Sequence, residues 1–226
     1  MKTLVGQMQI QVNENIYLKD PNSSDLGKRI VGQGIVLIDQ IGLESFTFRK
    51  LAMLLDTTES SIYRYFENKH KLLMYITSWY WGWLEYLLVF STTNITSPED
   101  RIRAAIKVIA EEMKDSDMFD HIDLGVLYRI VISESSKAFL TKEVDDGNRV
   151  GFYAVYKRLI GRISDMVLEI NPRFEHPHTL VSTIVEGIHH QKFFADHLPS
   201  LTDYRDDVNA LSGFYSDMAI AVAKKS

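Results

Sequence analysis

Apolar residues recur at helical spacing along the chain, beginning near residue 26. After the capping residues 22–24, the apolar positions that share one helical face are Leu26, Ile30, Leu37, Ile38 and Ile41. An Asn or Ser before the first periodic residue favours a helix start, and a glycine after the last one favours a stop. We therefore predict a first helix that ends at Gly42.

Two shorter helices are expected next. Thr47 is a suitable N-cap, and the apolar positions that follow it are Phe48, Leu51, Ala52 and Leu55. The polar run 56–58 interrupts this pattern, and Thr58 can cap a third helix that buries Ile62 and Phe66. The positions left facing outward are Glu59, Ser60, Ser61, Tyr63 and Arg64. Three short helices with a tight turn between the last two form a helix-turn-helix, which presents one polar helix face to a partner.

The rest of the chain is also patterned as helix. A long helix from Lys69 to about Phe90 carries an aromatic stripe made of Tyr75, Trp79, Trp83, Tyr86 and Phe90. Further helices are expected from Pro98 to about Met113 and at about 122–140, 147–170, 177–197 and 204–223. Residues 8–18 alternate loosely and are expected to form an extended arm. The predicted fold class is all-α, with a three-helix head followed by a larger helical domain.

Composition excludes several classes of protein. The chain has 226 residues, of which 46% are hydrophobic, and this suits a soluble globular protein. It has no cysteine, so disulfides, thiolate metal sites and cysteine nucleophiles are excluded. It also lacks a run of about 18 apolar residues and a basic start before an apolar run. We therefore expect a cytoplasmic protein.

The net charge of -5 is unevenly distributed. Residues 1–75 carry 9 Lys and Arg against 8 Asp and Glu, whereas residues 76–226 carry 16 against 22. Affinity for nucleic acid depends on positive charge close to the phosphates, so acidity elsewhere in the chain does not oppose it. The charge distribution permits DNA binding by the first part of the chain.

Two runs in the head carry a family resemblance. Residues 46–52 read FTFRKLA, and residues 61–69 read SIYRYFENK. These runs resemble the tetracycline-repressor (TetR) family of transcriptional regulators, and the resemblance covers about Leu26 to Leu73. It implies a homodimer on double-stranded operator DNA and a small-molecule effector that releases it. The implied organisation is an N-terminal arm at 1–23, a helix-turn-helix DNA-binding domain at 24–70 and a helical ligand-binding and dimerisation domain at 71–226.

The resemblance implies a role for each matching residue of the head. Thr47, Tyr63 and Lys69 would contact phosphates, and Arg49 would read a base, because arginine can bind guanine O6 and N7 together. Tyr65 occupies a place often held by histidine. The predicted DNA-binding residues are Thr47, Arg49, Lys50, Glu59, Ser60, Ser61, Tyr63, Arg64, Tyr65 and Lys69.

Three positions of the head depart from the family pattern, and one of them, Thr57, replaces a small apolar residue. Asp56 stands where a glycine is common in the turn, and aspartate enters the left-handed region more readily than most residues. Glu59 brings a negative charge to the recognition helix, which is costly beside DNA unless it accepts from cytosine N4 or points aside. These departures leave the fold prediction intact and the operator sequence open.

The larger domain is expected to bind an effector and a second subunit. The aromatic stripe favours core packing and can also line a ligand cavity; the candidate ligand-binding residues are Trp79, Trp83, Tyr86, Tyr128, Tyr156 and His189. The resemblance implies a four-helix dimer interface, and we expect the 147–170 helix and one of the two after it to form it. The apolar run expected at that interface is Tyr153, Tyr156, Ile160, Ile163 and Val167.

Metal-dependent and enzymatic functions are the alternatives. Glu186 and His189 have the Glu-x-x-His spacing of di-iron bundles, but the other copy of this spacing, Glu67 and His70, lies in the head. We find no catalytic triad, carboxylate pair or phosphate loop, and we expect no metal, no cofactor and no enzymatic activity. The competing hypothesis is a helical ligand- or metal-binding protein or enzyme whose head does not bind DNA. The sequence leaves activator and repressor both open.

Overall fold

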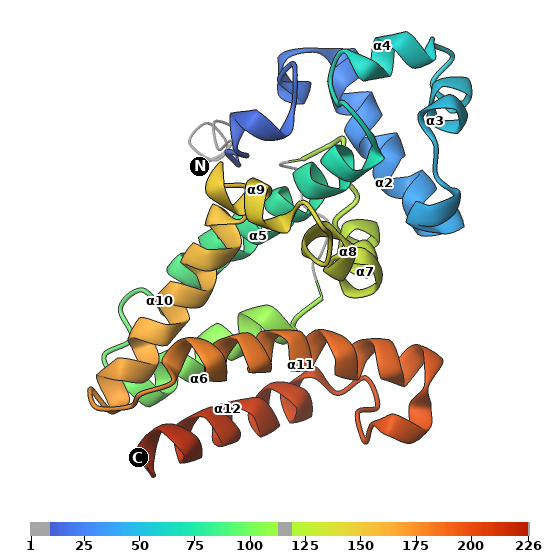
Figure 1. Cartoon of the computed structure of the whole chain (residues 1–226). Coiled ribbons are helices and arrows are strands. Elements are labelled where there is room, and N and C mark those ends of the chain that lie inside the picture. Colours follow the sequence, from blue (N-terminus) through green and yellow to red (C-terminus); the bar gives the residue numbers. More distant parts are fainter. Residues whose placement is uncertain (1–9, 113–118, 226) are drawn as a thin grey trace. The chain divides into compact units, whose positions relative to one another are not determined.

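A computed structural model describes residues 10–112 and 119–225, and every regular element in them is helical (Figure 1). The chain divides into two compact units. The first contains Met1–Gly82 and Glu112–Ala154, and the second contains Trp83–Glu111 and Val155–Ser226. Helix α5 (Lys69–Thr92) contributes to both. The predicted all-α class is confirmed, whereas the predicted boundary after residue 70 stays a prediction.

Helix α2 (Asp25–Ser45) begins as predicted and has a break at Gly42. The hydroxyl of Ser24 caps it by accepting from the Gly27 N–H. Gly42 has φ 71° and ψ 155°, which lie outside the helical region, and a short second helical segment follows it to Ser45. The predicted stop of the first helix at Gly42 is therefore confirmed by the backbone, although α2 as a whole continues past it. Glycine reaches this backbone conformation without the Cβ clash that other residues meet.

Helices α3 (Phe48–Leu54) and α4 (Glu59–Tyr63) confirm the predicted helix-turn-helix. The Thr47 hydroxyl accepts from the Lys50 N–H at 3.2 Å, and the Thr58 hydroxyl accepts from the Ser61 N–H at 3.3 Å. Asp56 has φ 50°, which is the left-handed turn expected of it. The predicted inward positions are all at most 4% exposed: Phe48, Leu51, Ala52, Leu55, Ile62 and Phe66.

The N-terminal arm contains helical turns, whereas residues 8–18 were expected to be extended. Two 3-10 helices, η1 (Glu14–Ile16) and η2 (Pro21–Ser23), occupy it, and residues 8 and 9 lie outside the described residues. Ile16 is buried, and the Leu18 N–H donates to the Tyr65 carbonyl at 2.8 Å. The arm therefore packs on the head.

Helices α7 (Leu124–Glu134), α8 (Ser136–Phe139) and α9 (Val144–Arg149) complete the first unit. Helix α7 packs on α2, and Arg129 pairs with Asp39 between them at 2.8 Å. The helix predicted over 122–140 is thus divided into two. The helix predicted over 147–170 is interrupted as well, because Gly151 adopts φ 84° ahead of α10 (Ala154–Ile170).

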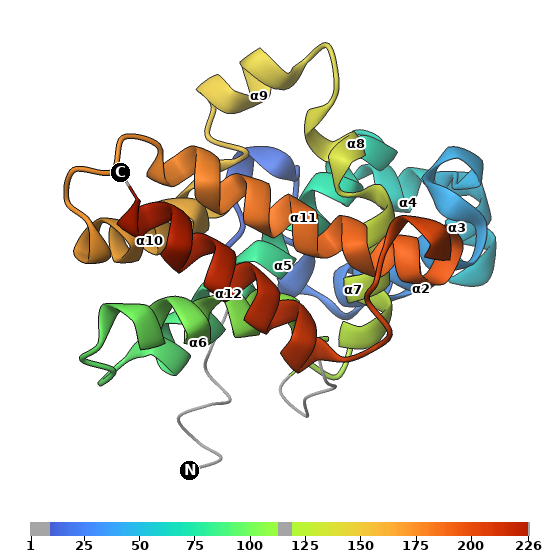
Figure 2. The ribbon, with the colours of Figure 1, turned by 90° about the horizontal axis from the view of Figure 1, so that it is seen from below.

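The second unit packs α6 (Pro98–Ala110) with α11 (Pro177–His197) and α12 (Val208–Lys224). The short η3 (Pro199–Leu201) joins the last two, which lie side by side in Figures 1 and 2. Gly187 permits their close approach, because a Cβ there would lie 2.6 Å from the Tyr215 hydroxyl. Among the described residues, none of the helices has the length and apolar character needed to cross a membrane.

Helix α10 turns its apolar face inward. Ile160, Ile163 and Val167 are each at most 7% exposed within one chain, so they belong to the core of the unit. They were expected to lie at a dimer interface. On the outward side, Arg158 and Arg162 both contact Glu85 of α5, with shortest N–O distances of 2.7 and 2.8 Å. The outward face of α10 is therefore charged.

The ion pairs of Glu85 with Arg158 and Arg162 should make the stability of the fold depend on pH. Burial alone would raise the pKa of Glu85, but the hydrogen bonds and charges of Arg158 and Arg162 outweigh it and hold that pKa below its usual 4.5. A carboxyl whose pKa is lower in the folded state stabilises the fold above its unfolded pKa, and this contribution disappears as the pH falls through the folded value.

We expect Glu85→Gln to lower the free energy of unfolding by about 1 kcal/mol at pH 7, since both arginines are half exposed. The difference from the wild type should shrink as the pH falls below the usual pKa of a glutamate, 4.5, and through the lower pKa of Glu85 in the folded state, where this carboxyl becomes protonated. Urea unfolding at a series of pH values measures it. A difference that stays constant at every pH at which the protein is folded would contradict the ionic account.

Candidate DNA-binding surface

The candidate surface is the polar face of α4 together with the start of α3. Tyr63 and Arg64 are exposed, as is Ser60, whereas Glu59 and Ser61 are partly covered. The edge of Tyr63 packs against the Phe48 ring, with centroids 5.1 Å apart, which fixes the aromatic side chain between α3 and α4. The guanidinium of Arg29 donates to the Leu55 carbonyl at 2.9 Å and so ties α2 to the turn. The predicted outward face is confirmed in these exposures.

Hydroxyl groups cluster at the N-terminus of α4. The Thr58 hydroxyl lies 2.9 Å from that of Ser60 and 2.8 Å from that of Ser61. These side chains share one hydrogen-bond network at the surface, and each hydroxyl can both donate and accept. Such groups suit contacts to phosphate oxygens and to base edges.

Two of the predicted DNA-binding residues, Lys50 and Lys69, bind the carboxyl end of α2. The ammonium of Lys69 donates to the carbonyls of Leu43 and Glu44 at 2.8 and 3.0 Å, and that of Lys50 donates to the Ser45 carbonyl at 2.8 Å. Cations are favourable at the negative end of a helix dipole. Lys69 therefore has a structural role that the sequence pattern did not indicate, and a phosphate contact would be additional to it.

Tyr65 is placed differently from the other predicted contacts. It is 3% exposed, its hydroxyl lies 2.7 Å from that of Ser24, and it accepts from the Lys19 ammonium at 3.4 Å. The helical period does not predict which way the Tyr65 side chain points, because α4 ends at Tyr63. The structure thus gives Tyr65 an internal position, which favours orienting the arm over touching DNA. Thr47, the N-cap of α3, and Arg49, in its first turn, are both exposed.

The six predicted ligand-binding residues fall in both units. Trp79 and Tyr128 belong to the first, and the remaining four, Trp83, Tyr86, Tyr156 and His189, belong to the second. Trp83 stacks on Tyr86 with centroids 5.3 Å apart, and the Tyr156 hydroxyl donates to the Glu186 carboxylate at 2.7 Å. Burial, aided by the charge of Lys192, lowers the pKa of His189 to about 3, so this imidazole is neutral.

The second unit contains an open cavity of about 340 Å³ that the sequence pattern did not indicate. Helices α5, α6 and α10 line it with apolar and ionic side chains: Leu88, Val89, Thr92, Thr93, Arg101, Arg162, Asp165, Met166 and Glu169. Arg101 pairs with Glu169 across it at 2.5 Å. In the described part of the chain, no three His, Asp or Glu residues are grouped so as to hold a metal ion.

Residues 30–76 match the family model of bacterial regulatory proteins of the tetR family. The helix-turn-helix head of this chain is therefore similar to that of tetR-family regulatory proteins. The match contains α3, α4 and the turn between them, which are the elements that carry the candidate surface. A comparison with the curated proteins found no match.

Solved structures share the fold of this chain at low sequence identity. A bacterial regulatory protein in the tetR family from Rhodococcus RHA1 aligns with TM-score 0.60 and 13% identity, covering 88% of this chain and 97% of that one. AibR in complex with isovaleryl coenzyme A and operator DNA aligns with TM-score 0.58 and 16% identity, covering 84% and 95%. The fatty acid degradation regulator FadR from Bacillus halodurans aligns with TM-score 0.57 and 12% identity, covering 85% and 93%.

Proposed function

We propose that this chain is a cytoplasmic transcriptional repressor that binds an operator duplex through α3 and α4 and is released by a small molecule. The observation that carries the proposal is the uncovered polar face of α4, held by the Thr58 cap and the Asp56 turn inside the TetR-matching segment. A helix presented in this way fits the major groove. No enzymatic step is assigned to the chain.

Each exposed group of the surface has a proposed role. Arg49 is the base-reading residue, since its guanidinium is exposed and can donate two parallel hydrogen bonds to guanine. Tyr63, Thr47 and Lys50 contact phosphates and set the register of the protein on the duplex. The hydroxyls of Ser60 and Ser61 contact base edges or phosphates. Glu59 and Arg64 complete the face of α4.

A second subunit is part of the proposal, because one head on one half-site gives little specificity. Helix α12 offers the most suitable face: Phe214 is 64% exposed and Val222 is 38% exposed. The charged outward face of α10 makes that helix less suitable. Two heads on one two-fold axis imply an operator that is a palindrome.

The effector is proposed to be a small organic molecule with an apolar part that binds the helical remainder. Support comes from the cavity in the second unit and from the fold shared with AibR, whose structure holds isovaleryl coenzyme A together with operator DNA. A ligand weakens DNA binding only as far as it prefers the conformation with misplaced heads, typically by about 1–3 kcal/mol.

The experiment that tests the proposal is selection of duplexes from a random pool by the purified chain, followed by affinity measurements at several salt concentrations. We expect one enriched palindrome and an affinity that falls steeply with salt. No enrichment together with no retention of any duplex at low salt would exclude DNA binding.

Replacing Arg49 by alanine should change the base preference more than the overall affinity. We expect a loss of about 1–3 kcal/mol for the selected duplex at one base position and little change for an unrelated duplex. Arg149→Ala is the matched control, since Arg149 is exposed, lies outside the head and pairs with Asp146. A loss for Arg49→Ala that is equal on every duplex would make Arg49 a phosphate contact instead.

A further inference from the structure

The interruption of α2 at Gly42 places one backbone N–H against a buried carboxylate. Leu43 is buried, and its N–H donates to Oε1 of Glu134, from the end of α7, at 3.2 Å. The Glu134 side chain is 10% exposed. A buried carboxylate is stable only if it is paired and hydrogen-bonded, so this contact is one that the fold has to keep.

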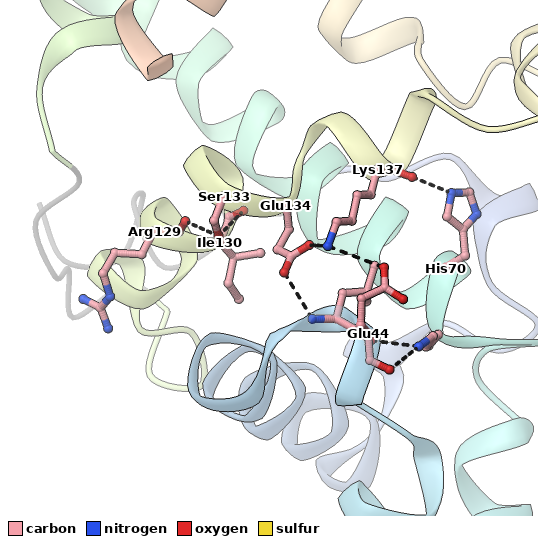
Figure 3. Close-up of polar contacts among 9 residues, drawn as sticks. Glu44, His70, Arg129, Ile130, Ser133, Glu134 and Lys137 are labelled. Atoms are coloured by element: carbon pink, nitrogen blue, oxygen red, sulfur yellow. Dashed lines mark hydrogen bonds and ion pairs between the residues drawn. The ribbon is translucent and has the colours of Figure 1, made fainter. Parts of the chain in front are cut away.

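The second oxygen of Glu134 is held from α8. The Lys137 ammonium lies 2.7 Å from Oε2, and the same ammonium lies 3.5 Å from the carboxylate of Glu44. The Lys137 carbonyl in turn lies 3.2 Å from Nε2 of His70, in the first turn of α5. Figure 3 shows Glu134 and Lys137 reaching from α7 and α8 toward Glu44 and the end of α2.

Leu43 is therefore held at both of its backbone polar groups. Its N–H is bound by Glu134, and its carbonyl is bound by Lys69, the residue that opens α5. Three residues after Leu43, the buried Phe46 and then the Thr47 cap lead directly into α3. Any displacement of this short segment, residues 43–46, moves the start of α3 and the ammonium of Lys69 with it.

The contact to Glu134 has little reserve in distance. At 3.2 Å, a shift of α7 by about 0.5 Å takes the donor and acceptor beyond the roughly 3.5 Å at which a hydrogen bond is still made. The segment then has two states, one in which the Leu43 N–H donates to Glu134 and one in which it does not. Because Gly42 can adopt other backbone conformations without steric penalty, residues 43–46 can change conformation when the contact breaks.

We propose that Glu134 is a positioning residue through which α7 and α8 set the placement of α3 and Lys69. This inference rests on the proposed function, since it assigns the route by which events in the rest of the chain reach the DNA-binding surface. Coupling between two sites is reciprocal, so binding of a duplex at the head must also stabilise the conformation of α7 and α8 that favours binding. That reciprocity allows a test without knowledge of the effector.

The test is hydrogen exchange of the full chain, free and with the selected duplex, in four proteins: wild type, Glu134→Ala, Glu134→Asp and Asp39→Asn. Asp39 also joins α2 to α7, through Arg129, but it lies in the regular part of α2 before Gly42 and serves as the matched control. In the free protein, Glu134→Ala should raise the exchange rate of amides 43–47 about tenfold and lower duplex affinity about tenfold. Asp39→Asn should do neither.

Duplex binding should slow exchange over residues 124–139 in the wild type and in Asp39→Asn, and this protection should disappear in Glu134→Ala. A protein in which Glu134 is merely structural would lose stability throughout the unit and would keep the protection. If Glu134→Ala does not fold, Glu134→Asp decides, because it retracts the carboxylate by about one bond length, roughly 1.5 Å, and keeps its charge.

The outcomes separate this inference from the proposed function. If the wild type binds no duplex, the proposed function fails, and the free-protein exchange of amides 43–47 alone judges whether Glu134 holds the segment. If the wild type binds duplex but both Glu134 variants retain its affinity and its protection at 124–139, the positioning role is overturned. Loss of that protection in Asp39→Asn as well would also overturn it.

Discussion

Replacing Phe66 by alanine is expected to lower the free energy of unfolding of the first unit by about 3–5 kcal/mol and to abolish duplex binding. Phe66 is 0% exposed, and its ring meets the edge of Tyr75 with centroids 5.5 Å apart. It thereby closes the end of α4 against α5. Deleting such a ring removes its burial energy and leaves a cavity that the surrounding helices fill only in part.

The loss of DNA binding follows from the length of α4. A helix of five residues is not stable by its helix propensity alone. Ordering its first turn costs more free energy than the hydrogen bonds of one turn supply. The helix therefore exists only while Ile62 and Phe66 are packed, and its polar face is presented only while it exists.

Urea unfolding and duplex titration measure both effects, with Phe90→Ala as the control. Phe90 is 74% exposed, so the same substitution removes the same atoms without opening a cavity and should cost less than about 0.5 kcal/mol. Equal costs for the two variants would show that Phe66 does not carry the packing of the head.

The helix-turn-helix was predictable because each of its signals is local. The hydroxyl caps at Thr47 and Thr58 act within three residues, and the apolar stripe of α3 is set by the helical period alone. The left-handed Asp56 likewise follows from the residue type and its place in the turn. None of these features needs a partner from elsewhere in the chain.

The features that the sequence did not predict depend on distant partners. Gly42 has the pattern of a helix stop, but Leu43 beyond it finds its acceptor in Glu134, 91 residues away. The break before α10 has a similar origin, because Asn13 of the arm donates to the Val150 carbonyl beside Gly151. Helical periodicity contains no information about such pairs.

The candidate site shows the same division. The outward positions of α4 were predictable from the period, whereas the role of Lys69 was not, because its acceptors are carbonyls about 25 residues earlier. Tyr65 lies just past the end of α4, where the period no longer assigns a face, and its burial comes from Ser24 and the arm. The ligand-binding residues remain a prediction.

A charge introduced at Phe214 is expected to break the dimer. On α12 the exposed positions that share one face are Ala210, Phe214, Asp217 and Ala221. Asp217 is paired with Arg103 at 2.7 Å, which leaves Phe214 as the one large apolar side chain among these four residues. A large aromatic residue surrounded by small neighbours is a typical centre for an interface between helices.

Phe214→Glu should raise the dissociation constant of the dimer by about 100-fold or more, because it removes the aromatic contact and places an unpaired carboxylate in a desolvated region. Sedimentation equilibrium measures the change. Phe90→Glu introduces the same charge at another exposed phenylalanine, on α5, and should leave the dimer intact. A dimer weakened by Phe90→Glu and not by Phe214→Glu would move the interface to α5.

The same variant connects assembly to DNA binding. If the operator is bound by two heads, each monomer of Phe214→Glu has to pay the association cost again on the DNA, so affinity for the palindrome should fall while binding of a single half-site stays unchanged. Raising the protein concentration should restore palindrome binding in the variant, because mass action restores the dimer. Unchanged palindrome affinity in a protein shown to be monomeric would mean that one head suffices.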